Sequence, residues 1–338
     1  MKKQMRTLAV LAALVAVCLA GYFALRAWNQ SREAASHTYL SRLTGVTRLS
    51  YDKEGEELSF TRDGDGNWTW DGDEDFPVDG TALEEAAGLL SALEAVRTID
   101  QPEALSSYGL EACQRTITAQ GDGDQTVTLL LGDEVDGNYY AMVQGNDTVY
   151  TVAGDLFEAT DHTLMELGTV DQPPIVTEST AETVVLQKGE RSVTLTKDTR
   201  TETQETGEAD ENGDPVTEEV TVYTWYLAGQ ALPQESEAVD ELISCLWDLS
   251  FDGCCAFKPE ESELEAMGLT GGDTLTLTVT YSEGQKLELL TGGPADGDGT
   301  TVCAMEAGSD MVYTMDSGMA EALEDLLDAD WTAVPEEG

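Results

Sequence analysis

The feature that most constrains the fold is an internal repeat. The stretch GNDTVYTVAGDLFEAT, Gly145 to Thr160, has a counterpart in GSDMVYTMDSGMAEAL, Gly308 to Leu323, which keeps Gly, Asp, Val-Tyr-Thr and Glu-Ala in register. In each stretch a Gly-x-Asp turn is predicted to reverse the chain, Val-Tyr-Thr to form a strand, and Asp155 or Ser317 to cap a helix. The chain is therefore predicted to contain two related copies of one fold.

The repeat extends to two segments with helical periodicity. Both segments carry five apolar residues spaced three and four apart, and the five pairs share one separation along the chain: Leu83, Ala86, Ala87, Leu90 and Leu93 in the first, and Val239, Leu242, Ile243, Leu246 and Leu249 in the second. These spacings place each set on one helical face, so both segments are predicted to be amphipathic helices. Upstream, the alignment pairs Trp70 with Tyr226 and Arg62 with Lys197.

Strand patterns surround these helices. Residues Thr274 to Tyr281 alternate threonines with Leu275, Leu277, Val279 and Tyr281, which is typical of a half-exposed antiparallel strand. In the first copy we expect strands near residues 46–51, 58–62, 68–71, 115–119, 126–131, 139–143 and 148–152. The predicted fold class is α+β, in which an N-terminal transmembrane helix precedes two tandem antiparallel sheets covered by helices.

The predicted domain boundaries follow from the repeat. The first copy is expected over residues 45–168, the linker with its adjacent prolines over 169–181, the second copy over 182–332 and a tail over 333–338. The second copy contains an insertion, residues 198–218, with almost no large apolar side chain. We expect this insertion to be a mobile acidic loop or the tip of an extended hairpin.

The N-terminal segment has the pattern of a membrane anchor. Eighteen residues from Leu8 to Leu25 carry no charge, and as a helix they would cover about 27 Å, close to the hydrocarbon thickness of a bilayer. The expected regions are a cytoplasmic N-terminus at 1–7, a transmembrane anchor at 8–26 and a juxtamembrane stalk at 27–44. Lys2, Lys3 and Arg6 favour a cytoplasmic N-terminus, so the remainder is expected to be extracytoplasmic. Cleavage of this segment is the open alternative.

The charge of the chain disfavours one class of ligand, and its cysteines do not indicate a disulfide-rich fold. The chain has 66 acidic against 17 basic residues, which disfavours binding to nucleic acid. Beyond the predicted anchor the cysteines are odd in number and irregularly spaced, so no disulfide framework is predicted: Cys113, Cys245, Cys254, Cys255 and Cys303. We expect them to be small buried side chains, while a vicinal ring or soft-metal ligation by Cys254 and Cys255 is the alternative.

One stretch resembles a calcium-binding loop. Asp63, Asp65, Asn67 and Glu74 occupy positions 1, 3, 5 and 12 of such a loop, so they are the candidate metal ligands and Ca²⁺ is the candidate cofactor. Position 6 is Trp68, however, where the loop needs glycine, and strands are expected on both sides. An Asp-Gly hairpin turn is the competing interpretation.

No catalytic motif is recognised in the sequence. The only histidines are His37 and His162, and neither is expected to act in catalysis. Trp68 and Trp70 alternate onto one face of a strand, where they could form a sugar or peptide platform or pack in the core. The chain is therefore predicted not to be an enzyme.

The chain resembles the domain of unknown function 4340 (DUF4340) family. The resemblance rests on the single N-terminal span, on the "YGL" and "MGL" turns at Tyr108 and Met267, and on the strand, "VYT" and helix ending of each copy. Members of that family are associated with ABC-type exporter components of the gliding-motility kind, which implies an accessory role in an envelope transport complex.

These observations predict a membrane-anchored, extracytoplasmic binding or scaffold subunit, accessory to an ABC-type transporter or another envelope complex. Two alternatives stay open, namely an envelope hydrolase acting on glycan or peptide and a calcium-stabilised adhesion or spacing module. The sequence leaves the ligand, the partner's identity and the oligomeric state undetermined.

Overall fold

The computed structural model describes Tyr22, residues 38–209 and residues 215–334. The chain divides into two compact units, Met1–Thr163 and Leu164–Gly338. The predicted cytoplasmic N-terminus, nearly all of the predicted anchor at 8–26, and most of the stalk, including His37, lie outside the described residues. Among the described helices, none combines the length and the apolar character needed to cross a bilayer.

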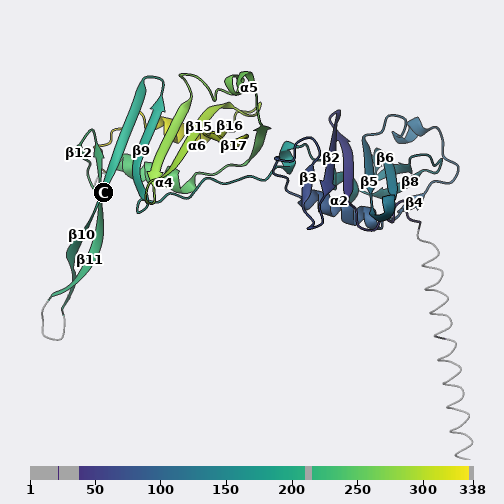
Figure 1. The fold of residues 1–338 in the computed structure, drawn as a ribbon, viewed down its shortest axis with the longest axis horizontal. Helices are drawn as coiled ribbons and strands as arrows, with labels where there is room; N and C mark the ends of the chain where they lie inside the picture. The colour runs from purple at the N-terminus through teal and green to yellow at the C-terminus, as the bar shows by residue number, and fades with distance from the viewer. Residues whose placement is uncertain (1–21, 23–37, 210–214, 335–338) are drawn as a thin grey trace, which may run out of the picture. The chain divides into compact units, whose positions relative to one another are not determined.

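The first unit is built on an antiparallel sheet of eight strands in the order β3-β2-β1-β5-β6-β7-β8-β4 (Figure 1). Its strands are β1 (Arg48–Lys53), β2 (Glu56–Arg62), β3 (Trp68–Trp70), β4 (Arg97–Thr98), β5 (Arg115–Gln120), β6 (Thr126–Val135), β7 (Asn138–Val143) and β8 (Tyr150–Ala153). Its helical segments are α2 (Thr81–Ser91), α3 (Asp155–Ala159), η1 (Leu105–Tyr108) and η2 (Asp122–Asp124).

The core of the first unit lies between the sheet and the apolar face of α2. Leu49, Tyr51, Leu58 and Phe60 alternate along β1 and β2 and are almost completely buried. Helix α2 buries the predicted stripe residues Leu83, Ala86, Ala87 and Leu90. The amphipathic helix that the sequence predicts here is therefore confirmed, and its packing against the sheet removes apolar surface from water.

The second unit contains a sheet of nine strands in the order β12-β11-β10-β9-β14-β15-β16-β17-β13. Its strands are β9 (Ala181–Lys188), β10 (Arg191–Ala209), β11 (Pro215–Leu227), β12 (Gln230–Ala231), β13 (Gly253–Phe257), β14 (Leu275–Tyr281), β15 (Gln285–Pro294), β16 (Thr301–Glu306) and β17 (Met311–Asp316). Its helical segments are η3 (Met165–Leu167), α4 (Glu237–Asp248), α5 (Glu261–Ala266) and α6 (Ser317–Asp325). Helix α4 buries Val239, Leu242 and Leu246 of the second predicted stripe.

The described residues of the acidic insertion, 198–209 and 215–218, lie in the outer part of a long hairpin. Strand β10 pairs with β9 only from Arg191 to Thr196, whereas its pairing with β11 continues outward to Ala209. Figure 1 shows this β10–β11 ribbon extending from the second sheet. Of the two predicted forms of the insertion, the structure therefore contains the extended hairpin.

The structure overturns the predicted fold class. Both antiparallel sheets are present, but strands dominate, and the fold is mostly β rather than two sheets covered by helices. The longest described helix, α4, has 12 residues and is about 18 Å long, whereas nine strands side by side extend over about 40 Å. Helices of this length cover only part of such a sheet. Among the residues that the structure describes, no helix corresponds to the predicted transmembrane helix.

The helix caps also differ from the prediction by one residue. The sequence places the caps of the two closing helices at Asp155 and Ser317, but the N-cap residues are Gly154 and Asp316. The Asp316 carboxylate accepts a hydrogen bond of 3.1 Å from the backbone N–H of Met319. The Asp316 carboxylate thus satisfies an open N–H group of the first turn, whereas Gly154 has no side chain that could cap its helix and Asp155 lies inside that helix.

Candidate functional site

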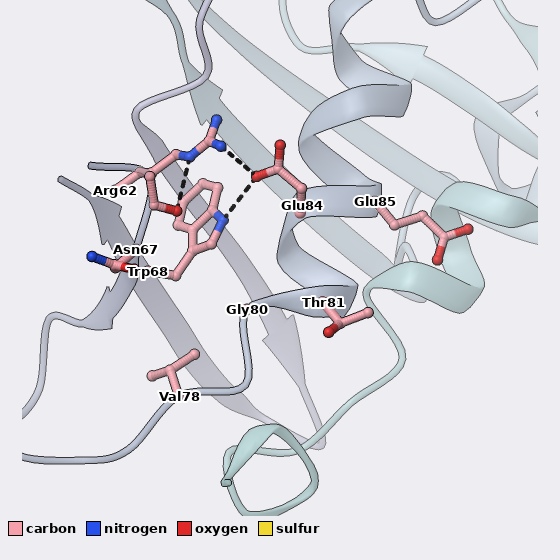
Figure 2. Close-up of a pocket in the computed structure, with 9 residues that line it drawn as sticks. Arg62, Asn67, Trp68, Val78, Gly80, Thr81, Glu84 and Glu85 are labelled. Carbon is pink, nitrogen blue, oxygen red and sulfur yellow. Dashed lines mark hydrogen bonds and ion pairs between the residues drawn. The ribbon is translucent and has the colours of Figure 1, made fainter. Parts of the chain in front are cut away.

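A surface pocket of about 610 Å³ lies beside strand β3 and the first turns of helix α2. Figure 2 shows the residues that line it, which come from the β2–β3 hairpin, from the loop before α2 and from α2 itself: Arg62, Gly66, Asn67, Trp68, Val78, Gly80, Thr81, Glu84 and Glu85. We refer to it as the Trp68 pocket. Its wall combines an indole, a guanidinium group and two carboxylates, so it offers both apolar and charged contacts.

The hairpin turn between β2 and β3 positions Trp68. The Asp63 carboxylate accepts hydrogen bonds from the backbone N–H groups of Asp65 at 2.9 Å and Asn67 at 2.8 Å, and its second oxygen accepts one from the Asn67 amide at 3.1 Å. These bonds fold the short acidic stretch into a turn. The register that follows places Arg62 directly opposite Trp68.

Glu84 joins these two side chains. The indole Nε1 of Trp68 donates a hydrogen bond of 3.4 Å to Glu84 Oε2, and Arg62 Nη2 lies 2.8 Å from the same oxygen. Arg62 Nε also donates to the Gly66 carbonyl at 3.3 Å, and these contacts are drawn in Figure 2. Because the two donors share one oxygen, the carboxylate keeps its other oxygen for a ligand.

Gly80 provides the space that the indole occupies. A Cβ atom at Gly80, the N-cap residue of α2, would lie only 2.9 Å from Trp68 Cδ1. The helix can therefore begin this close to the hairpin only because the residue has no side chain. Trp68 is 6% exposed, which makes it mainly a packed wall of the pocket rather than a flat platform.

The two carboxylates of the pocket do not face one another. Glu84 points toward Arg62 and Trp68, whereas Glu85, the next residue on α2, points away from them (Figure 2). A glycosidase needs two carboxyl groups on opposite sides of one bond. The pocket therefore has the groups of a binding site, and its carboxylates lack the arrangement that hydrolysis of a glycan requires.

The second unit contains a similar arrangement. Lys197 on β10 lies directly opposite Trp225 on β11, and the indole Nε1 of Trp225 donates to Glu178 Oε1 at 3.2 Å. Lys197 Nζ donates to the Glu178 carbonyl and lies 4.5 Å from the centre of the Tyr223 ring. Burial lowers the pKa of Lys197, an effect that Glu178 and Glu182 partly oppose.

This register corrects the sequence alignment of the two copies. The alignment pairs Trp70 with Tyr226, but the strand pairing makes Trp68 equivalent to Trp225, each opposite a basic residue. Both units thus place a basic side chain and a tryptophan in one cross-strand pair, with a glutamate bound to the indole. The sequence did contain a signal for this equivalence, because shifting the alignment by one residue pairs Trp68 with Trp225.

The calcium candidates are divided between two places. Asp63, Asp65 and Asn67 lie in the β2–β3 turn, whereas Glu74 follows β3 and shares with Asp63 a second hollow, of about 480 Å³, that neither Asp65 nor Asn67 lines. The hydrogen bonds of the turn, first that of the Asn67 backbone, lower the pKa of Asp63. Strand β2 precedes the stretch from Asp63 to Glu74, strand β3 lies within it, and helix α2 begins after it at Thr81. Within the described part of the chain, no three His, Cys, Asp or Glu side chains are grouped as metal ligands.

Other predicted residues have structural contacts. The His162 carbonyl accepts a hydrogen bond of 3.0 Å from the Tyr51 hydroxyl. Trp70 makes an edge contact with Phe76 at 5.8 Å between ring centres and does not line the Trp68 pocket. The five described cysteines are free thiols. The sequence missed Glu84 and Glu178, because nothing in a local pattern shows that these carboxylates meet a tryptophan of another element.

The fold and the site define a two-unit, antiparallel β protein with a mixed-charge pocket at the edge of its first sheet. The family described as "Domain of unknown function (DUF4340)" matches residues 68–224. The predicted family resemblance is therefore confirmed over these residues, which begin at Trp68 and continue across the boundary between the units. No curated protein and no solved structure matches the chain.

Proposed function

We propose that this protein is a binding or scaffold subunit, held on the outer side of a membrane by its N-terminal segment, that docks a partner protein at the Trp68 pocket. The observation that carries the proposal is the preformed contact of Arg62 and Trp68 with Glu84 in an open pocket. Arginine is one of the residue types that dominate binding energy at protein interfaces, Trp68 forms a packed wall behind it, and a site that is already ordered loses little entropy on binding.

The position of the pocket indicates how a partner would dock. Strand β3 is an edge strand of the first sheet, and the pocket opens beside it. An extended segment of a partner can add to a sheet edge, where main-chain hydrogen bonds give affinity and a neighbouring pocket selects one side chain. A segment with a basic or amide side chain fits best, because that group can reach the second oxygen of Glu84.

The cellular setting comes from the family resemblance. DUF4340 relatives imply an accessory role beside an ABC-type transporter, so the proposed partner is a subunit of such a transporter or of another envelope complex. Attachment to the membrane raises the effective concentration of the pocket near membrane-bound partners. The acidic character of the chain, with a formal charge of −49, favours a partner surface with basic groups.

Site-specific photo-crosslinking in native membranes tests the proposal. A photoreactive phenylalanine derivative at Glu85, which lines the pocket, is expected to capture a transporter subunit, while the same group at the exposed Glu134 of strand β6 is not. As a second arm, Glu84→Gln is expected to reduce recovery of that subunit, and Glu134→Gln to leave it unchanged. Equal capture at both positions, or recovery of the protein without any transporter subunit, would contradict the proposal.

A further inference from the structure

Two cysteines that are far apart in the sequence meet in the second unit. The sulfur atoms of Cys255, on β13, and Cys303, on β16, lie 3.7 Å apart. Cys303 is 2% exposed, and Cys255 is partly buried. The sequence offered Cys254 as the neighbour of Cys255, but the fold supplies Cys303 instead.

A β-bulge turns Cys255 toward Cys303. Along the pairing of β13 with β17, Cys254 lies opposite Tyr313 and Ala256 opposite Val312, so Cys255 is the extra residue of the bulged strand. Cys254 takes another direction, because its sulfur lies 3.6 Å from the Thr169 carbonyl. The bulge therefore separates two adjacent thiols and directs only Cys255 into the interior.

The arrangement of the strands disfavours a disulfide. Strand β17 lies between β13 and β16, so the two backbones that carry the cysteines are separated by about 9–10 Å. A disulfide needs Cα atoms about 4.4–6.8 Å apart, and closing one here would require backbone movement. Two sulfurs bound to one tetrahedral metal ion, in contrast, lie about 3.8 Å apart, as follows from metal–sulfur bonds of about 2.3 Å. The observed separation suits a bridging ion.

The surroundings add further soft ligands. Cys303 and Met305 belong to a buried cluster with Leu269 and Val312, and Cys255 and Met267 pack against that cluster. Thiolate and thioether sulfur atoms select Cu(I), whereas Zn²⁺ sites in proteins use thiolate, imidazole and carboxylate ligands. We propose that Cys255 and Cys303 form a binding site for a soft monovalent metal ion, Cu(I), with the thioethers of Met305 and Met267 as additional ligands.

A hydrogen bond joins the two thiols, and either sulfur can be its donor. When the ion binds, it takes the place of the proton between the sulfurs, and the thiol protons are released to solvent.

The test is a Cu(I) titration of the reduced full-length chain in detergent, without oxygen, in competition with a chromogenic Cu(I) chelator. We expect a single ion to bind per chain. Replacing a second-shell residue weakens metal binding about 10–100-fold, so loss of a direct ligand in Cys255→Ser or Cys303→Ser is expected to weaken it at least about 100-fold. Met305→Leu is expected to weaken it less than either serine variant. X-ray absorption of the complex should show only sulfur neighbours.

Two controls keep the proposal falsifiable. Cys113→Ser, which changes a thiol in the first unit, and Cys254→Ser, which changes the adjacent thiol, are expected to leave the affinity unchanged. Circular dichroism and thermal melting of the metal-free variants verify that they fold. The proposal is overturned if the wild type binds Cu(I) no more tightly than the Cys255→Ser/Cys303→Ser double variant. It is also overturned if the isolated chain lacks both thiols and has lost two hydrogens in mass, which would identify a disulfide.

Discussion

Arg115 is a buried cation in the first unit, and its partners connect three elements. Its side chain is 4% exposed, its Nη1 donates to the Asp52 carbonyl at 2.8 Å, and its Nη2 lies 2.5 Å from Asp161 Oδ1. Lys53 Nζ lies 2.6 Å from the same oxygen. Asp161, which follows helix α3, therefore holds the ends of β1 and β5 together.

We expect Asp161→Asn to destabilise the protein by about 1–2 kcal/mol, because a neutral amide leaves the buried Arg115 with weaker compensation for its charge. The value lies toward the lower end of the usual range because the Asp161 side chain is 42% exposed and solvent screens the pair. Denaturant unfolding monitored by circular dichroism measures the effect. Asp136→Asn, in the exposed β6–β7 turn, is the matched control and should change the midpoint little.

The same carboxylate gives a pH dependence. Hydrogen bonds from Lys53 and Arg115 lower the pKa of Asp161, although its partial burial acts in the opposite direction. A lowered pKa in the folded state means that the stabilisation is complete above the ordinary value of 3.8 and is lost as the pH falls through the folded value. The difference in unfolding free energy between wild type and Asp161→Asn should therefore shrink as the solution is acidified. A difference that stays constant or grows would contradict this origin.

At the scale of elements, helix α2 has one glycine at its N-cap and one in its interior, and we expect opposite effects from their substitution. At Gly80, a methyl group would meet the Trp68 indole at 2.9 Å, whereas at Gly88, inside the helix, it would meet nothing within 4 Å. We expect Gly80→Ala to cost about 1–3 kcal/mol through overpacking, and Gly88→Ala to stabilise the helix by about 1 kcal/mol. Thermal melting compares the two variants. If both stabilise the protein, the contact of α2 with Trp68 is looser than the structure indicates.

The outer part of the β10–β11 hairpin is expected to contribute little to the stability of the second unit. From Thr201, which lies opposite Thr221, the two strands pair only with each other. Replacing residues 202–220 with an Asn-Gly turn should therefore change the unfolding free energy of the second unit by less than about 1 kcal/mol, because a two-residue turn of this type closes an antiparallel pair. A large loss of stability in denaturant unfolding would show that the ribbon supports the sheet.

Regular periodicity explains which elements the sequence could predict. The stripes of α2 and α4 were recognised because their apolar spacing is a property of each segment alone. The register of β3 was misjudged because a slip of one residue exchanges the two faces of a strand, and the alignment of Trp70 with Tyr226 contained that slip. The balance between sheet and helix was misjudged because the pattern does not report how much of a sheet a short helix can cover.

The candidate site was predictable only in part, for a related physical reason. The Asp63 turn follows from local chemistry, and the sequence named an Asp-Gly turn as one interpretation of it. The contact of Glu84 with Trp68 and the meeting of Cys255 with Cys303 depend on tertiary packing between separate elements. No pattern within a single sequence connects such residues, because their spacing along the chain follows no period.

At the scale of the whole molecule, the excess of negative charge should make stability depend on salt. The chain carries 66 acidic and 17 basic residues, and several of the described cations already hold elements together, as Arg191 does with Glu324 and Asp328 of the α6 region. Repulsion among the remaining carboxylates destabilises the compact state and is screened by added salt. We expect the melting temperature to rise between about 0.01 M and 1 M NaCl, over which the screening length falls from about 30 Å to 3 Å. A fall would mean that the ion pairs outweigh the repulsion.

The tryptophans of the two halves obtain their glutamates from different sources. Glu84 belongs to a helix that follows its hairpin, whereas Glu178 belongs to the segment that precedes strand β9. The acidic partner therefore need not come from one position relative to the hairpin, since a carboxylate from either direction along the chain can serve the indole. Homologues that retain the tryptophan while taking its acid from the other direction are an expected consequence of that freedom.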